Sequence, residues 1–351
     1  YRTMIVVVTD EVGDDENRLE SAVEAATRAK VPVYVLGSQA VFGRLEGYMD
    51  YTDPRTKQVF RHVPVRQGPE SVVPEQIRLP FWYDGPQYDL IESGFGPYSL
   101  SRLASATGGI YFVARFGSRR LGFDPARMRE YRPDWVSRSK YEESVSRSPL
   151  RQAVLNAARI TQQKLPGMPG LHFPPTDSPE FKDALAANQA LAERTAYTVA
   201  EALEPLDAVA RLRDRETSRR WQAQYDLARG RLLAMKVRCY EYNWICARMK
   251  KDPPKFEKSG SNAWWLVADE PNGYSEKVAD AAQDARKLLR RVVEEHPDTP
   301  WALLAARDLK DPMGFKWVEV TIPRRRQGDD SPAPKRKREM NPTRPRTPPK
   351  L

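Results

Sequence analysis

The run of β-branched residues between Met4 and Val8 constrains the fold of this chain more than any other feature. It is uncharged and does not alternate between apolar and polar residues, which is typical of a parallel strand covered on both faces. Apolar residues then recur at helical spacing as far as Lys30, and Val31 to Leu36 is strand-like again before Gly37. A strand, a helix and a strand within about 35 residues form a βαβ unit with a right-handed crossover. The sequence therefore predicts an α/β fold that begins with a parallel sheet.

An irregular, proline-rich segment follows from residue 41 to residue 95. A loop of this length inside a compact domain is either functional or a folded insertion. Short alternating pieces from Gln58 to Val65 predict a hairpin at the edge of the sheet. Ser99 to Ala106 then predicts a helix, and Ile110 to Ala114 predicts a third strand.

Beyond Arg115 the pattern becomes helical. Ser148-Pro149 and Ser178-Pro179 each look like a helix cap followed by proline at the first helical position. We expect Pro205 to break or kink the second of these helices, and a longer helix to continue to about Lys251.

The longer helix carries apolar residues that step by four and three without a break. These residues are Trp221, Tyr225, Ala228, Leu232, Met235, Cys239, Tyr242, Cys246 and Met249. Such a seam predicts that the helix packs along its length on a partner helix, as in a coiled coil. We interpret Cys239 and Cys246 as small apolar fillers of this seam rather than as redox residues or ligands.

Two more helices are expected, from Ser275 to Glu295 and from Thr299 to Leu309. Together they look like a tetratricopeptide-type hairpin, although an ordinary hairpin that closes a bundle has the same pattern; either one implies contact with another protein. Residues 324–351 contain ten Lys/Arg against three Asp/Glu, so +7 of the formal net charge of +10 lies there. This composition predicts a disordered basic tail over residues 323–351.

The sequence offers little for catalysis. Its three histidines are scattered, and none has a nucleophile motif such as Gly-x-Ser-x-Gly beside it. The glycine-rich stretches lack the lysine and the spacing of a phosphate-binding loop. No apolar run is long enough to span a membrane. We therefore predict a binding protein with no enzymatic activity, no small-molecule substrate and no membrane segment in this chain.

Three stretches occur in an order that carries more information than any one of them. They are Val7-Val8-Thr9-Asp10-Glu11 at the end of a strand, the strand from Val31 to Gly37, and Thr107-Gly108-Gly109-Ile110-Tyr111-Phe112 ahead of the last strand. Over about residues 2 to 115 they resemble the second half of a von Willebrand factor type A (vWA) domain. In that family the turn that corresponds to Thr9-Asp10-Glu11 is usually Thr-Asp-Gly, and its aspartate belongs to a metal-ion-dependent adhesion site, where a divalent cation bridges the domain to an acidic group of a partner. The resemblance thus implies that Asp10 is a metal ligand.

The chain also departs from the family pattern. The Asp-x-Ser-x-Ser loop of vWA domains and the threonine that follows it are missing, and Glu11 stands where glycine is usual. Magnesium needs six oxygen ligands in octahedral geometry, which one carboxylate does not supply. We therefore expect magnesium only in a longer parent protein that contributes the other ligands, and none in this chain alone.

Acidic residues gather just beyond the first strand. Glu11, Asp14 and Asp15 lie where open α/β sheets bind ligands, and we predict that they contact a partner. The alternative for Asp14, Asp15 and Glu16 is that they cap the following helix and complement its dipole.

These patterns divide the chain into four parts: a partial, Rossmann-like vWA domain over residues 1–118 with an insertion at 41–95, a helical region over 119–252, a helical hairpin over 253–322 and the tail. The predicted function is that of a vWA-type protein-interaction or scaffold module. The alternative is a protein that associates with nucleic acid or an anionic surface through Lys335, Arg336, Lys337 and Arg338 of the tail.

One prediction follows from the first strand. Met4 to Val8 resembles the fourth strand of a vWA sheet, which in that family lies against the first strand. Because nothing in this chain resembles the family's first strand, we expect the apolar edge from Met4 to Val8 to be exposed. Because an unpaired, uncharged edge is a template for another strand, we expect the chain on its own to aggregate or to pair through this edge. Light scattering tests this, and a clean monomer would contradict it.

Overall fold

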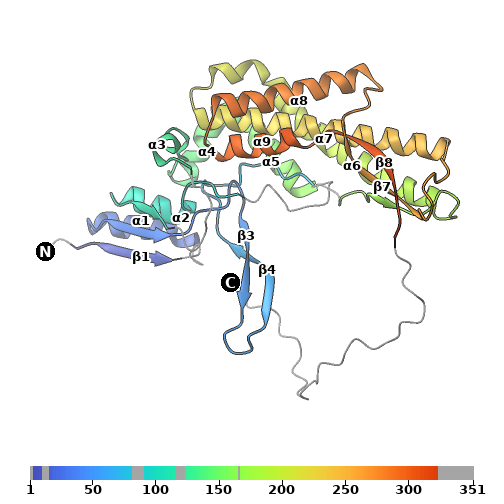
Figure 1. Ribbon diagram of the computed structural model, residues 1–351. Coiled ribbons are helices and arrows are strands. Elements are labelled where there is room, and N and C mark those ends of the chain that lie inside the picture. Colours follow the sequence, from blue (N-terminus) through green and yellow to red (C-terminus); the bar gives the residue numbers. More distant parts are fainter. Residues whose placement is uncertain (1–2, 10–15, 81–90, 115–122, 165–166, 323–351) are drawn as a thin grey trace.

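The computed structural model describes residues 3–9, 16–80, 91–114, 123–164 and 167–322 (Figure 1). It contains a small parallel sheet, a projecting hairpin and a larger helical region with a second small sheet. The predicted order of a parallel sheet followed by a helical region is confirmed.

The parallel sheet has the strand order β1-β2-β5, with β1 at Ile5–Thr9, β2 at Val33–Gly37 and β5 at Tyr111–Val113. Both neighbouring pairs are parallel. Helix α1 (Leu19–Arg28) connects β1 to β2, and α2 (Tyr98–Ala106) precedes β5. The βαβ unit and the third strand that the sequence predicts are therefore present.

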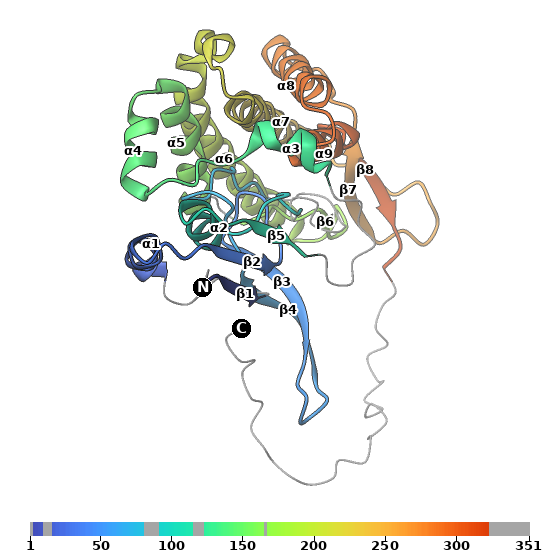
Figure 2. The same ribbon diagram turned by 90° about the vertical axis from the view of Figure 1, so that its left-hand side faces the viewer.

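Helices α1 and α2 cover the same face of this sheet (Figure 2). Val33, Val35 and Ala104 are buried there, and Ala26 of α1 and Leu103 of α2 pack against them. Right-handed connections that step across a sheet in one direction place their helices on one face, which accounts for this arrangement.

The insertion does not extend the parallel sheet. Its strands β3 (Glu46–Thr52) and β4 (Val59–Arg66) pair antiparallel with each other, in a separate two-stranded sheet. The prediction of a hairpin at the edge of the main sheet is therefore wrong in its position, because the hairpin projects from the body of the molecule (Figures 1 and 2). Other parts of the insertion, such as Phe42 and Ile77, are buried among residues of the helical region.

The helical region is built around one long helix, α7 (Arg219–Lys251), which contacts α5, α6, α8 and α9. The helices are α3 (Pro125–Met128), α4 (Arg138–Ser146), α5 (Pro149–Lys164), α6 (Phe181–Ala208), α8 (Glu276–Glu295) and α9 (Pro300–Lys310), with 3-10 turns at Glu16–Arg18, Arg129–Tyr131 and Ala210–Arg215. Every position of the predicted seam is buried. Residues of α7 outside the seam are buried as well, so this helix lies at the centre of an array rather than in a two-helix pair.

Proline marks the starts of α5 and α9, which begin at Pro149 and Pro300. Helix α6 begins at Phe181 instead of the predicted Pro179, and Pro205 does not end it. Helix α6 continues through Pro205 to Ala208, and the break before α7 comes at the 3-10 turn that follows. Pro205 lies in the last turns of α6, where Leu206 is fully buried, so we attribute the continuation of the helix to tertiary packing.

The sequence did not predict the second small sheet. Strands β6 (His172–Phe173), β7 (Ala263–Asp269) and β8 (Gly314–Val320) pair antiparallel in that order. Leu266 and Phe315 are buried, and the Phe315 ring lies edge-on to Tyr242 of α7 at 5.7 Å. This sheet therefore closes one end of the helical array.

A buried ion pair ties the insertion to α7. The guanidinium of Arg220 donates to Glu70 Oε1 at 2.9 Å and to Glu75 Oε2 at 2.6 Å, and all three side chains are buried. Burial raises the pKa of Glu75, and the charge of Arg220 acts against that shift. Tyr141 also donates to Glu75 Oε1, at 3.0 Å. Two carboxylates that share one guanidinium need these further donors to remain buried.

Candidate interaction site

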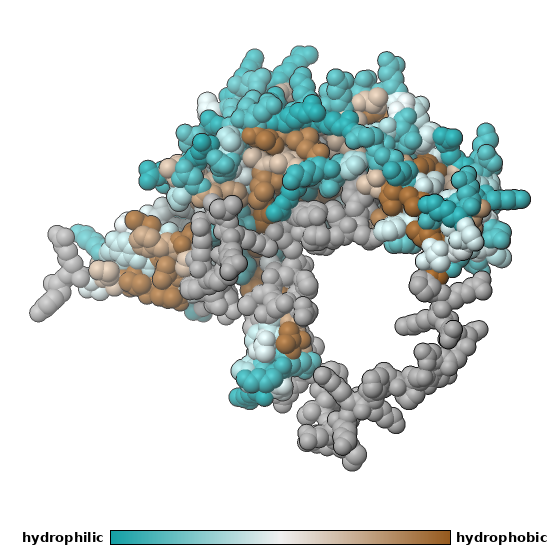
Figure 3. Space-filling model, in the orientation of Figure 1, coloured by the Kyte–Doolittle hydropathy of each residue, from teal (hydrophilic) through white to brown (hydrophobic). Residues whose placement is uncertain are grey.

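The face of the parallel sheet opposite α1 and α2 is apolar and exposed. Register places Val8 of β1 beside Leu36 of β2, and Leu36 beside Phe112 of β5, so their side chains share one face. Val8 is 67% exposed and Phe112 is 50% exposed. Figure 3 shows apolar side chains gathered over this part of the molecule.

This patch is unusual for its extent. Half of the large apolar side chains that are exposed in the described part of the chain belong to the sheet or lie directly beside it. They are Met4, Ile5, Val6, Val8, Leu36, Ile110, Phe112 and Val113. By alternation along the strands, Ile5 and Val113 lie on the face of α1 and α2, whereas Val6, Val8, Leu36 and Phe112 lie on the open face. Parallel sheets are normally covered on both faces, so an exposed apolar face of this kind indicates a binding surface.

The outer edge of β1 is also open, because no described strand lies beyond it. The N–H of Ile5 donates to the carbonyl of Pro32 at 3.0 Å. Alternate residues of β1 therefore bond to β2, while the backbone groups of Val6 and Val8 point away from it. None of the residues of β1 is charged, so this edge lacks the charges with which proteins usually prevent strand pairing.

The carboxyl ends of the three strands lie together and are closely packed. A Cβ atom on Gly37 would lie 2.9 Å from the carbonyl oxygen of Thr9 and 2.4 Å from the hydroxyl of Tyr111, so only glycine fits at the end of β2. The Tyr111 hydroxyl donates to the carbonyl of Ser38 at 2.7 Å. This hydrogen bond joins β5 to the loop after β2.

The residues that the sequence singles out lie outside the described part of the chain. Strand β1 ends at Thr9, and Asp10, Glu11, Asp14 and Asp15 follow it in the sequence. Lys335, Arg336, Lys337 and Arg338 of the tail also lie outside. Their roles therefore stay predictions. The edge position of β1 was predicted from the sequence. The exposed face was not, because the sequence does not show that α1 and α2 lie on the same side of the sheet.

A cavity of about 440 Å³ lies among the first turns of α1 and α2, the base of the hairpin and α4. Its walls carry two ion-paired glutamates: Glu16 is 2.8 Å from Arg66, and Glu20 is 3.1 Å from Arg102 beside the cavity. Tyr98, Ser99 and Arg138 also line it. Among the described residues, its lining contains neither histidine nor cysteine, and its charged and hydroxyl groups are suited to recognition.

Asp226, Glu295 and His296 come close enough together to suggest a metal site. The two carboxylates, however, are already paired with arginines. Asp226, which is fully buried, contacts Arg213 at 2.7 Å and also Arg291, and Arg213 contacts Glu295 as well. A cation at this point would lie beside these guanidinium groups and would be repelled by them. We therefore interpret the cluster as an ionic network that joins α7, α8 and the 3-10 turn before α7.

His296 is neutral in this network. Its Nδ1 atom lies 3.0 Å from the hydroxyl of Tyr131. Burial, followed by the charges of Arg219 and Arg213, lowers the pKa of His296 to about 4. Because this is below the ordinary value of 6.5, the unfolded chain takes up a proton at a pH at which the folded chain does not. The stability from neutral His296 is present above pH 6.5 and is lost as the pH falls toward 4.

The two cysteines of α7 are unsuited to chemistry. Both are fully buried, and burial raises the pKa of the Cys246 thiol to about 12. Burial also raises the pKa of Cys239. A thiol reacts as the thiolate, so neither cysteine is a nucleophile at neutral pH. This agrees with their interpretation as apolar fillers.

Comparison with protein-family models, curated proteins and solved structures found no match to this chain. Among the described helices, none is both long and apolar enough to cross a membrane.

The pH dependence of His296 can be tested with His296→Gln. Between pH 7 and pH 4.5 we expect the free energy of unfolding of the unsubstituted protein to fall by about 2.5 kcal/mol more than that of the variant, from 1.36 kcal/mol per pKa unit. Urea unfolding at both pH values measures the difference. Glu75, whose pKa is raised, changes the free energy of unfolding with pH in the opposite direction. This contribution is present in both proteins, so it cancels in the comparison. Equal losses in both proteins would contradict the assignment.

Proposed function

We propose that this chain is a vWA-type protein-interaction module, which binds another polypeptide through its open parallel sheet. The observation that carries the proposal is the combination of an uncharged strand edge, unpaired among the described residues, with an exposed apolar face on the same three strands. An open edge offers backbone donors and acceptors, and an apolar face offers burial; a folded or folding polypeptide can use both.

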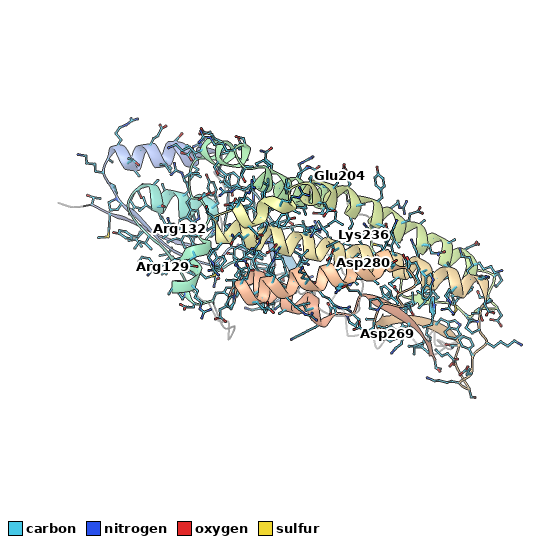
Figure 4. The ribbon with its side chains drawn as sticks, turned by 90° about the horizontal axis from the view of Figure 1, so that it is seen from above. Arg129, Arg132, Glu204, Lys236, Asp269 and Asp280 are labelled. Carbon is cyan, nitrogen blue, oxygen red and sulfur yellow. The ribbon has the colours of Figure 1, made fainter. Side chains whose placement is uncertain are left out.

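The rest of the surface supports this choice of site. Figure 4 shows Glu204, Lys236 and Asp280 on three neighbouring helices, α6, α7 and α8. The helical array thus carries charges of both signs, as is usual for a solvated surface, whereas the residues of β1 carry none. We propose that the array acts as a rigid scaffold from which the sheet is presented.

The metal-dependent part of the proposal rests on the resemblance to vWA domains. Asp10 follows directly on β1, at the carboxyl end of a parallel strand, which is the position that such a ligand requires. Magnesium binding would need further oxygen ligands from a longer parent protein. Glu11, Asp14 and Asp15 would then contribute to partner binding beside the cation.

The double variant Val8→Lys/Phe112→Lys tests the proposed surface. Both side chains are at least half exposed, so we expect the free energy of unfolding to change by less than about 1 kcal/mol. We expect proteins that co-purify with the chain from its own cells to be reduced at least roughly tenfold, because two buried charges are costly in an apolar interface.

Tyr197→Lys provides the matched control, since Tyr197 is 74% exposed on α6 and distant in sequence from the sheet. It should leave the bound proteins unchanged. If the double variant still retained these proteins, the result would contradict the proposal.

A further inference from the structure

We infer that the cavity among α1, α2 and α4 binds a phosphate monoester, with its phosphate group at the start of α2 and beside Arg138. Three observations carry the inference. Three helices begin at the cavity without side-chain caps, a buried hydroxyl in its wall has no partner, and one arginine of its lining lacks a close carboxylate. The cavity lies among the helices of the covered face of the sheet, so the inference does not depend on the proposed protein-binding surface.

Three helices start at the wall of this cavity. Residues from the first turn of each helix line it: Leu19 and Glu20 of α1, Tyr98 and Ser99 of α2, and Arg138 of α4. No side chain caps the start of any of these helices. The first N–H groups of a helix have no acceptor within the helix and carry partial positive charge, which makes a helix start a binding site for anions.

The start of α2 offers the best-defined donors. The N–H of Tyr98 donates to the carbonyl of Pro69 at 2.9 Å, which ties the helix to another part of the cavity wall. The N–H and the hydroxyl of Ser99 have no hydrogen-bond partner among the described residues, although Ser99 is only 9% exposed. A buried polar group without a partner is costly. Ser99 therefore presents two unused donors to the cavity.

The charges of the lining favour an anion. Both of its glutamates, Glu16 and Glu20, are paired with arginines and so add little net charge. Arg138 lies 3.5 Å from the carbonyl of Val72 and 3.8 Å from Glu142, and both distances are longer than a strong hydrogen bond. Its guanidinium is therefore available to a ligand, and a guanidinium binds two phosphate oxygens at once.

The arrangement of the donors favours a phosphate over a carboxylate. The donors belong to helices that are far apart in the sequence, so they approach the cavity from separate walls. A phosphate monoester has three terminal oxygens that accept in different directions, whereas a carboxylate has two oxygens in one plane. Because the site is assembled from separate helix starts, it needs no glycine-rich phosphate-binding loop in the sequence.

The cavity also has room for an organic group. Its volume of about 440 Å³ lies within the range of roughly 300–1,000 Å³ that is usual for small-molecule sites. Leu45, Val72 and Val73 give its wall an apolar part, against which an organic group can pack. The Tyr98 hydroxyl donates to the carbonyl of Val136 at 2.6 Å and so fixes the segment before α4 to α2. The walls are therefore held in place before a ligand binds.

Isothermal titration calorimetry of the full chain tests the inference, at about 0.15 M salt to screen binding by exposed charges. The probes are phenyl phosphate, inorganic phosphate and benzoate. We expect phenyl phosphate to bind at least roughly tenfold more tightly than inorganic phosphate, because its ring packs on the apolar wall. We expect the same margin over benzoate, which lacks the third oxygen.

Arg138→Gln should weaken the binding of phenyl phosphate at least roughly tenfold, because it removes a charged donor. Arg147→Gln is the matched control. Arg147 lies at the other end of α4, outside the lining, and both arginines are exposed and face a glutamate one helical turn away. The control should bind phenyl phosphate as the unsubstituted chain does.

Ser99→Ala removes the unpaired hydroxyl and leaves no other group without a partner. We therefore expect the affinity for phenyl phosphate to fall at least roughly threefold, while the thermal unfolding followed by circular dichroism stays unchanged.

A short peptide that contains phosphoserine distinguishes the source of the phosphate. Tighter binding of this peptide than of phenyl phosphate, lost in Arg138→Gln, would support the site and place the monoester on a partner polypeptide. Weaker binding would support a small molecule. The inference would be overturned if phenyl phosphate did not bind, if benzoate bound as tightly, or if Arg138→Gln and Arg147→Gln had equal effects.

Discussion

A parallel β-sheet has to be covered on both faces, and the sheet of this protein is covered on one. Helices α1 and α2 bury Val33 and Val35 from one side, whereas Val8 and Phe112 face solvent on the other. The same sheet ends in an uncharged strand, β1, whose outer backbone groups have no strand beside them within the described part of the chain. The need to cover this apolar face and to pair the outer edge of β1 is the physical basis for the proposed binding function.

The helical array is more self-sufficient. Its central helix α7 is buried around most of its circumference, and its buried Arg220 is paired with Glu70 and Glu75. The insertion contributes both of these carboxylates, so it is fixed to the array. The sheet, in contrast, has a small core of its own that centres on Val33, Val35 and Ala104. Binding through the sheet would therefore bury the least protected apolar surface of the molecule.

Local patterns in the sequence predicted the elements whose burial repeats regularly. The β-branched run gave β1, and the seam from Trp221 to Met249 gave the buried side of α7. Pairing between distant segments was missed: β7 and β8 lie about 50 residues apart in sequence, and nothing local in either one marks its partner. The docking of Glu75 on Arg220 was missed for the same reason, because a buried charge looks like a solvated one in sequence. The vWA relationship and the roles of Asp10, Glu11, Asp14 and Asp15 remain predictions.

Hydrogen exchange of the β1 amides tests the open sheet most directly. In the isolated chain, diluted below the concentration at which it self-associates, the account predicts that the amides of Val6 and Val8 exchange rapidly. The amide of Val7, which faces β2, should be protected at least roughly tenfold more strongly, because it is hydrogen-bonded within the sheet. Equal protection of all three amides under these conditions would show that the edge of β1 is already paired and would contradict the account.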